Sequence, residues 1–150
     1  LTSEVELNLN NAKFDFNLGM SAFENLQKPS SDRYQFIFPY YDFSTNLFSN
    51  NYGFVDFTSK GSNDLKDTNN LITRVINDFN FSTIDKIFYD YGNINNFELF
   101  LKNTNTVGKN DNQFNSNPDY SLSSMFVFNS SLPLIKKKII IYHHLLQKSL

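Results

Sequence analysis

Alternation of apolar and polar residues is the clearest pattern at the start of the chain. Val5, Leu7 and Leu9 alternate with polar residues, and residues 12 to 18 alternate again after a pair of asparagines. Because asparagine tolerates the positive φ of a two-residue turn, this pattern predicts a β-hairpin over residues 5 to 18 with one apolar face. The predicted cross-strand pairs are Leu9 with Ala12, Leu7 with Phe14, and Val5 with Phe16. This register would place Glu6 opposite Asp15, which is unfavourable.

Three further segments have the composition of β-strands. They are the alternating residues Tyr34, Phe36 and Phe38, the aromatic run Phe54, Val55 and Phe57, and the alternating residues Phe97, Leu99 and Leu101. Alternation over a few residues with aromatic side chains is typical of a half-buried strand. Residues 40 to 51 mix polar and aromatic types without a period that assigns them to either class.

Helical spacing predicts two adjacent helices near residues 69 to 91. The first has apolar residues at Leu71, Ile72, Val75, Ile76 and Phe79, and the second has them at Ile84, Ile87, Phe88 and Tyr91. Gly92 would end the second helix. Ser21 and Glu24 have the spacing of a capping box, which predicts a short helix that ends before Pro29.

The remaining segments are predicted as loops or as a C-terminal element. Residues 58 to 69 are rich in Ser, Gly, Asn and Asp and predict a loop. Residues 103 to 118 hold six asparagines and predict a long mobile loop. After the apolar run 125 to 128, residues 134 to 146 favour a helix, with a buried strand at 139 to 142 as the alternative.

Taken together, these elements predict a single α+β domain over residues 1 to 150. We expect a mainly antiparallel sheet with two to four helices on one face. With 17 Phe and 8 Tyr, rings must supply much of the apolar burial. So many rings with so few charges would leave apolar patches exposed, which predicts contact surfaces for neighbouring molecules.

Charge and residue usage narrow the functional classes. The net charge of -2 lacks the basic character typical of nucleic-acid-binding domains. The absence of Cys excludes disulfides, thiolate metal sites and Cys nucleophiles. No membrane span is predicted, because the longest clean apolar run, residues 139 to 142, is far shorter than a spanning helix. The first residues, with Glu4 and Glu6, lack the pattern of a targeting peptide.

No residue pattern predicts catalytic, cofactor-binding or metal-ligating chemistry, so we expect a protein that is not an enzyme. His143 and His144 are adjacent, and neighbouring helical residues point too far apart to share a metal ion. The five glycines form no phosphate-binding motif. Lys136, Lys137 and Lys138 form the one basic cluster, a candidate contact for RNA or an acidic partner, although the pattern favours an exposed turn or helix face with the lysine side chains in water.

The composition resembles that of mitochondrially encoded proteins of protists such as ciliates. The chain has 23 Asn and 17 Phe but 5 Gly and 4 Pro, a bias toward residues with A+T-rich codons. The resemblance covers composition and the first residue, Leu1, and no family motif supports it. It implies a mitochondrial location.

That resemblance implies a non-catalytic structural subunit of a large mitochondrial assembly, with the mitochondrial ribosome as the first expectation. Two alternatives stay open: a peripheral soluble subunit of a respiratory-chain complex, and a secreted or bacterial binding module. The expected partners are other protein subunits and, in the ribosomal case, ribosomal RNA, with no small-molecule substrate.

Overall fold

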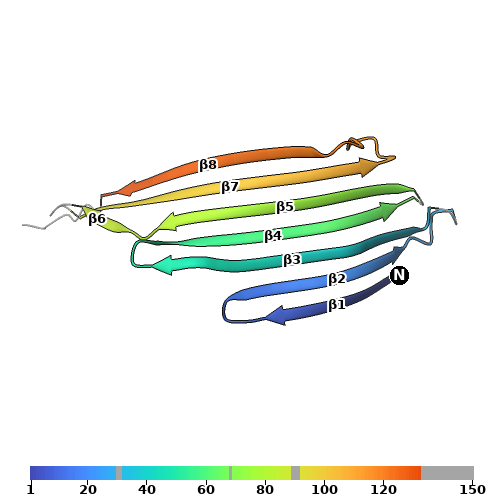
Figure 1. Ribbon diagram of the computed structural model, residues 1–150, viewed down its shortest axis with the longest axis horizontal. Helices are drawn as coiled ribbons and strands as arrows, with labels where there is room; N and C mark the ends of the chain where they lie inside the picture. The colour runs from blue at the N-terminus through green and yellow to red at the C-terminus, as the bar shows by residue number, and fades with distance from the viewer. Residues whose placement is uncertain (30–31, 68, 89–91, 133–150) are drawn as a thin grey trace, which may run out of the picture.

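The computed structural model describes residues 1–29, 32–67, 69–88 and 92–132 of the chain. Within these ranges the protein is one antiparallel sheet of eight strands (Figure 1). The strands are β1 (Thr2–Asn10), β2 (Phe14–Glu24), β3 (Tyr34–Asn50), β4 (Gly53–Lys66), β5 (Asn70–Thr83), β6 (Lys86–Phe88), β7 (Asn93–Lys109) and β8 (Asp119–Ser131). Strands β1 to β5 pair in chain order, β5 pairs with β7, and β8 pairs with the other side of β7. The short β6 pairs with the first residues of β7.

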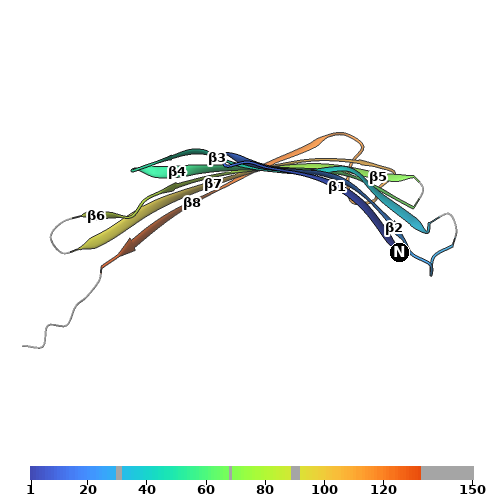
Figure 2. The same ribbon diagram turned by 90° about the horizontal axis from the view of Figure 1, so that it is seen from below.

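The sheet is a single curved layer (Figure 2). No hydrophobic side chain in the described ranges is buried, and those ranges contain no helix or second sheet that could cover either face. Long antiparallel strands twist and coil, which accounts for the curvature. The sheet therefore has two exposed faces and no core between layers.

Strand register sorts the side chains onto these two faces, because directly opposed residues in an antiparallel pair point to the same side. One row across the sheet joins Leu9, Phe16, Phe43, Ser59, Asn77, Asn103 and Leu122. The next row, on the opposite face, joins Asn8, Asn17, Asp42, Lys60, Ile76, Thr104 and Ser121. We call the face of the first row the apolar face and the face of the second row the polar face.

The predicted α+β class is wrong, because every regular element among the described residues is a strand. Residues 71 to 79 lie in β5, and residues 86 to 88 form β6. In β5, Leu71, Val75 and Phe79 point to the apolar face, whereas Ile72 and Ile76 point to the polar face. Apolar residues on both faces imitate helical spacing, yet a segment rich in β-branched residues favours a strand.

Other predicted boundaries also differ from the structure. The predicted loop at 58 to 69 is largely the second half of β4, and residues 103 to 109 complete β7. The capping-box pair Ser21 and Glu24 lies in β2. Small polar residues occupy both faces of these strands, so the sequence there lacks the alternation of apolar and polar residues that indicates a strand. The segment 40 to 51 continues β3 to Asn50, and residues 134 to 146 lie outside the described ranges.

The predicted hairpin is confirmed, but its register differs. The turn runs through residues 11 to 13, and the Asn11 amide donates to the Phe14 carbonyl at 2.9 Å. This longer turn places Leu9 opposite Phe16 and Leu7 opposite Leu18. The shift keeps every apolar residue on the same face and moves Glu6 opposite Gly19, which removes the predicted Glu6–Asp15 apposition.

Candidate interaction surface

The apolar face is the most unusual surface of the molecule. Across β1 to β5, β7 and β8, the charged residues on this face lie only at strand ends, at Glu24 and Lys109. Large apolar side chains on it remain exposed, including Val5 (62%), Leu7 (53%) and Phe126 (64%). Large exposed apolar patches mark interaction sites in proteins, so this face is the candidate interaction surface.

Aromatic rings pack against one another on the apolar face without being buried. The ring centroids of Phe97 and Phe128 lie 4.8 Å apart, and those of Phe97 and Phe126 lie 5.9 Å apart. On the same face, between β3 and β4, the ring centroids of Phe43 and Phe57 lie 6.3 Å apart. Such pairs stabilise strand register, and their outer surfaces remain available to a neighbour.

A chain of hydrogen bonds crosses the middle of the apolar face, and we call it the amide belt. The hydroxyl groups of Tyr41 and Ser59 lie 3.1 Å apart, and Ser59 donates to Asn77 Oδ1 at 2.7 Å. Asn77 Nδ2 and Asn105 Nδ2 then donate to Asn103 Oδ1 at 3.2 and 2.7 Å. The belt links β3, β4, β5 and β7 through uncharged groups.

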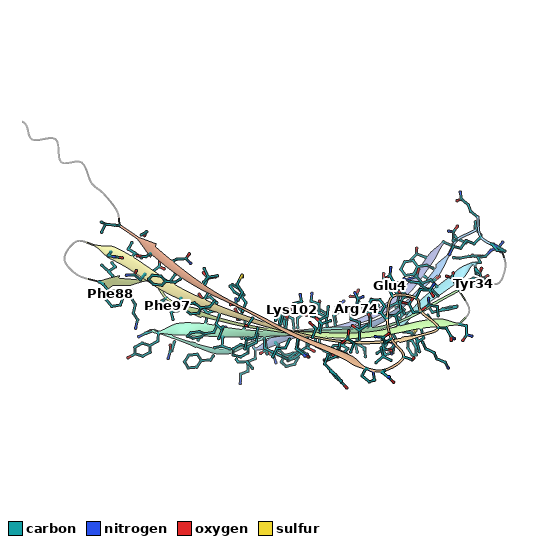
Figure 3. The ribbon with its side chains drawn as sticks, turned by 90° about the horizontal axis from the view of Figure 1, so that it is seen from above. Glu4, Tyr34, Arg74, Phe88, Phe97 and Lys102 are labelled. Atoms are coloured by element: carbon teal, nitrogen blue, oxygen red, sulfur yellow. The ribbon has the colours of Figure 1, made fainter. Side chains whose placement is uncertain are left out.

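The polar face carries most of the charge, and it is the concave side of the sheet, where Figure 3 places Glu4, Arg74 and Lys102. Register assigns nine acidic and four basic residues to it: Glu4, Glu6, Asp15, Asp42, Asp56, Asp64, Asp78, Glu98 and Asp119, with Lys60, Lys66, Arg74 and Lys102. Lys60 pairs with Asp42 at 2.7 Å, and Lys102 pairs with Asp78 at 3.7 Å. These pairs are half-exposed, which indicates a face that contacts water.

Two aromatic rings lie over glycines, one on each face. Tyr40 covers Gly19 on the polar face and donates from its hydroxyl to Glu4 Oε1 at 2.8 Å. This hydrogen bond and the nearby negative charge raise the pKa of the Tyr40 phenol. Tyr41 covers Gly61 on the apolar face. Each ring takes the space that a side chain at the glycine would need, as in the covering of strand glycines by cross-strand aromatics.

The connection between β7 and β8 folds against the polar face. Asn70 Nδ2 donates to Asp111 Oδ2 at 2.8 Å, and the Asp111 carboxylate accepts the backbone amides of Gln113 and Phe114. These hydrogen bonds, led by that from Asn70, lower the pKa of Asp111. The Arg74 guanidinium lies 5.2 Å from the centroid of the Phe114 ring. The connection is therefore anchored to β5.

An open groove of about 440 Å³ is lined by residues of β1, β2 and β3, beside the irregular pairing of β2 with β3. Its lining residues are Ser3, Glu4, Val5, Met20, Ser21, Ala22, Phe36 and Phe38. The surface of the groove is almost wholly apolar, and it continues the apolar face at the β1 edge of the sheet. It lacks the convergent polar groups that fix a small ligand in a binding pocket.

The two outer strands leave long edges of the sheet unpaired among the described residues. β1 has 9 residues and β8 has 13, and each pairs on one side only. Both strands lack proline. Water-soluble sheets usually protect such edges with charge, bulges or short strands. β1 carries Glu4 and Glu6, whereas β8 carries a single charged residue, Asp119, at its first position.

The predicted chemical candidates all lie outside the described residues. The basic cluster Lys136, Lys137 and Lys138 and the pair His143 and His144 fall outside the described ranges. Within those ranges, no group of three or more His, Asp or Glu side chains is placed to hold a metal ion. A search of the same residues finds no helix with the length and apolarity to cross a membrane.

The apolar face itself was expected only in outline, from the excess of aromatic residues. Its alternation could be recognised at residues 5 to 18, but the amide belt could not, because its members come from four strands. Comparison with protein-family models, curated proteins and solved structures yields no match to the chain.

Proposed function

We propose that the chain is a non-catalytic structural wall whose apolar face lies against lipid hydrocarbon and whose polar face lies against water. The observation that carries this proposal is the confinement of charge to one face of a long sheet. A Lys or Arg side chain that faces hydrocarbon near the middle of the layer costs about 2–4 kcal/mol. A face without charge between its strand ends meets that requirement.

Strand length supports hydrocarbon as the neighbour, a proposal that departs from the expectation of no membrane span, which was argued from helix length alone. About 9 to 11 inclined residues cross a hydrocarbon layer, and β3 and β7 have 17 residues while β4 and β5 have 14. Within a lipid layer, backbone groups at a sheet edge also need partners. The proposal therefore requires further strands at the edges of β1 and β8, from the same protein or another one.

The charge of the polar face bears on the assemblies expected from composition. Nine acidic against four basic residues would repel phosphate groups, which argues against this face as an RNA contact. A lipid-facing wall suits the membrane setting of a respiratory-chain assembly or a bacterial envelope better than a ribosome. Mitochondrial location remains a prediction from composition.

Neighbouring residues of β4 provide a direct test, because the chain has no Trp and each introduced Trp would be unique. Phe57 points to the apolar face and Thr58 to the polar face. The full chain carrying Phe57→Trp or Thr58→Trp is placed in vesicles whose acyl chains are brominated. We expect strong quenching of the fluorescence at position 57 and weak quenching at position 58.

Two outcomes would contradict the proposal. Equal quenching at both positions would show that the faces do not differ in their contact with lipid. A chain that stays folded and monodisperse in buffer, without entering vesicles, would show that its apolar face does not need hydrocarbon.

A further inference from the structure

The outer edge of β8 is the longer of the two edges that the described part of the sheet leaves without a strand partner. β8 has 13 residues, pairs only with β7, and exposes nearly all of its side chains. In a lipid layer such an edge is costly, because hydrocarbon offers the backbone amide and carbonyl groups no hydrogen bonds. The proposed function therefore requires a strand beside β8.

The direction of β8 restricts which strand can lie there. Every strand pairing is antiparallel, and five strands separate β8 from β1, so the two outer strands run in the same direction (Figure 1). With the apolar faces on one side, β1 of the same copy or of another copy would pair with β8 in parallel, the less stable arrangement. A twofold axis perpendicular to the sheet instead brings β8 of a second copy antiparallel to β8, in an isologous contact.

The sequence of β8 suits that contact. When Asp119 lies opposite Ser131 of the second copy, Met125 lies on the twofold axis, opposite its own equivalent. Opposed residues then have numbers that are both odd or both even, so they share a face, and the outward backbone groups of one copy meet those of the other. On the apolar face, this register places Leu122 opposite Phe128 of the second copy, an apolar pair that stabilises strand pairing.

Charge distinguishes β8 from β1 as an edge that can pair with itself. In β8 the single charged residue, Asp119, would lie at the opposite end of the contact from its own equivalent. The same full-length pairing of two β1 strands would place Glu6 opposite Glu6 of the second copy. Like charges directly opposite each other are destabilising. The β8 edge is therefore the self-complementary one.

We propose that the edge of β8 pairs with the edge of β8 of a second copy, antiparallel and with Met125 on the twofold axis, so that one sheet continues through both copies. The inference rests on the proposed function, which places this edge in a lipid layer. Addition of a strand to an exposed edge is a recurrent mode of association through backbone hydrogen bonds. The contact leaves the apolar face open, including Phe57 on β4, three strands away from β8.

Disulfide formation in vesicles tests this contact, because the chain has no Cys. In the full chain, Met125→Cys places two thiols on directly opposed residues, whose Cα atoms lie about 5 Å apart, within the reach of a disulfide. Phe100→Cys is the matched control, because Phe100 lies beside Met125 in the same row, one strand inward. Its two copies would lie three strand spacings apart, about 14 Å, which a disulfide cannot join. On oxidation with copper phenanthroline, we expect a covalent dimer of Met125→Cys and none of Phe100→Cys.

Charge exchange at the same position tests the register without a covalent bond. Met125→Glu and Met125→Lys should each lose self-association in vesicles, measured by energy transfer between labelled full chains, because like charges would lie opposite each other. A mixture of the two variants should associate. Association of either variant alone, or no association in the mixture, would overturn the contact.

The disulfide measurement can also overturn the contact, and it can do so without touching the proposed function. No dimer of Met125→Cys, or an equal yield from Phe100→Cys, would refute pairing at β8. Slow amide exchange along β8 without that disulfide would show that another segment or another protein occupies the edge. The Phe57→Trp quenching tests lipid contact separately. Quenching that persists without the disulfide refutes the edge contact alone, whereas loss of the quenching difference refutes the proposed function.

Discussion

The two faces of the sheet are built from the same strands but differ in the polar groups that they carry. On the polar face, Lys60 and Asp42 form an exposed pair, and Tyr40 extends its hydroxyl to Glu4. On the apolar face, Tyr41 directs its hydroxyl into the amide belt instead of leaving it free. The polar groups named on both faces are hydrogen-bonded, but those on the polar face include charged side chains, whereas the belt is uncharged. The difference between the faces is therefore one of charge: register places nine acidic and four basic residues on the polar face, and charge on the apolar face only at Glu24 and Lys109.

The largest effect is expected when the same charged residue is introduced on each face in turn. Phe57→Lys should lower the free energy of unfolding in lipid vesicles by about 2–4 kcal/mol, because an ammonium group would face hydrocarbon. Thr58→Lys should change it little, since position 58 lies on the polar face opposite Asp78. Urea unfolding of both variants in vesicles measures the effect. Similar losses of unfolding free energy in the two variants would show that both faces contact the same medium.

A smaller effect is expected at the two glycines beneath tyrosine rings. An added Cβ at Gly61 would overlap the ring of Tyr41, and one at Gly19 would overlap the ring of Tyr40, so either ring must move. Tyr40 could exchange its bond to Glu4 for bonds to water on the polar face, whereas Tyr41 would lose its bond to Ser59 on the apolar face. Gly61→Ala should therefore destabilise the sheet by about 1–3 kcal/mol, as overpacking does.

The matched variant is Gly19→Ala, for which we expect a small change, because alanine also suits a strand better than glycine. Urea unfolding again provides the measurement. An equal or larger loss in Gly19→Ala would show that the surroundings of the two rings do not differ as described.

Sequence patterns predicted strands at several places where the two faces differ locally in polarity, but not over β8. The hairpin at 5 to 18 and the segments around Phe36, Phe57 and Leu99 belong to strands as predicted. Elsewhere the faces resemble each other in sequence. Asparagines of the belt occupy apolar-face positions in β5 and β7, while Ile72 and Ile76 occupy polar-face positions.

The belt itself depends on contacts that local sequence does not contain. Ser59, Asn77 and Asn103 meet in one row although 18 and 26 residues separate them along the chain. Their proximity is determined by the register of three strands, which turn lengths and long-range pairing set together. Asparagine richness at 103 to 118 therefore predicted a loop, whereas residues 103 to 109 form a strand whose amides find partners across the sheet.

The smallest expected effect concerns the polar face, where a titratable group anchors the connection after β7. The pKa of Asp111 is lowered because its ionised carboxylate accepts hydrogen bonds from Asn70 and from the backbone of Gln113 and Phe114. A lowered pKa means that this stabilisation is present above the ordinary aspartate range and is lost as the pH falls through the lowered value. Amide hydrogen exchange at residues 112 to 115 should therefore accelerate in acid relative to exchange in β4. In Asp111→Asn, which cannot titrate, the acid-dependent acceleration should disappear, whereas an unaltered pH profile would show that another group anchors this connection.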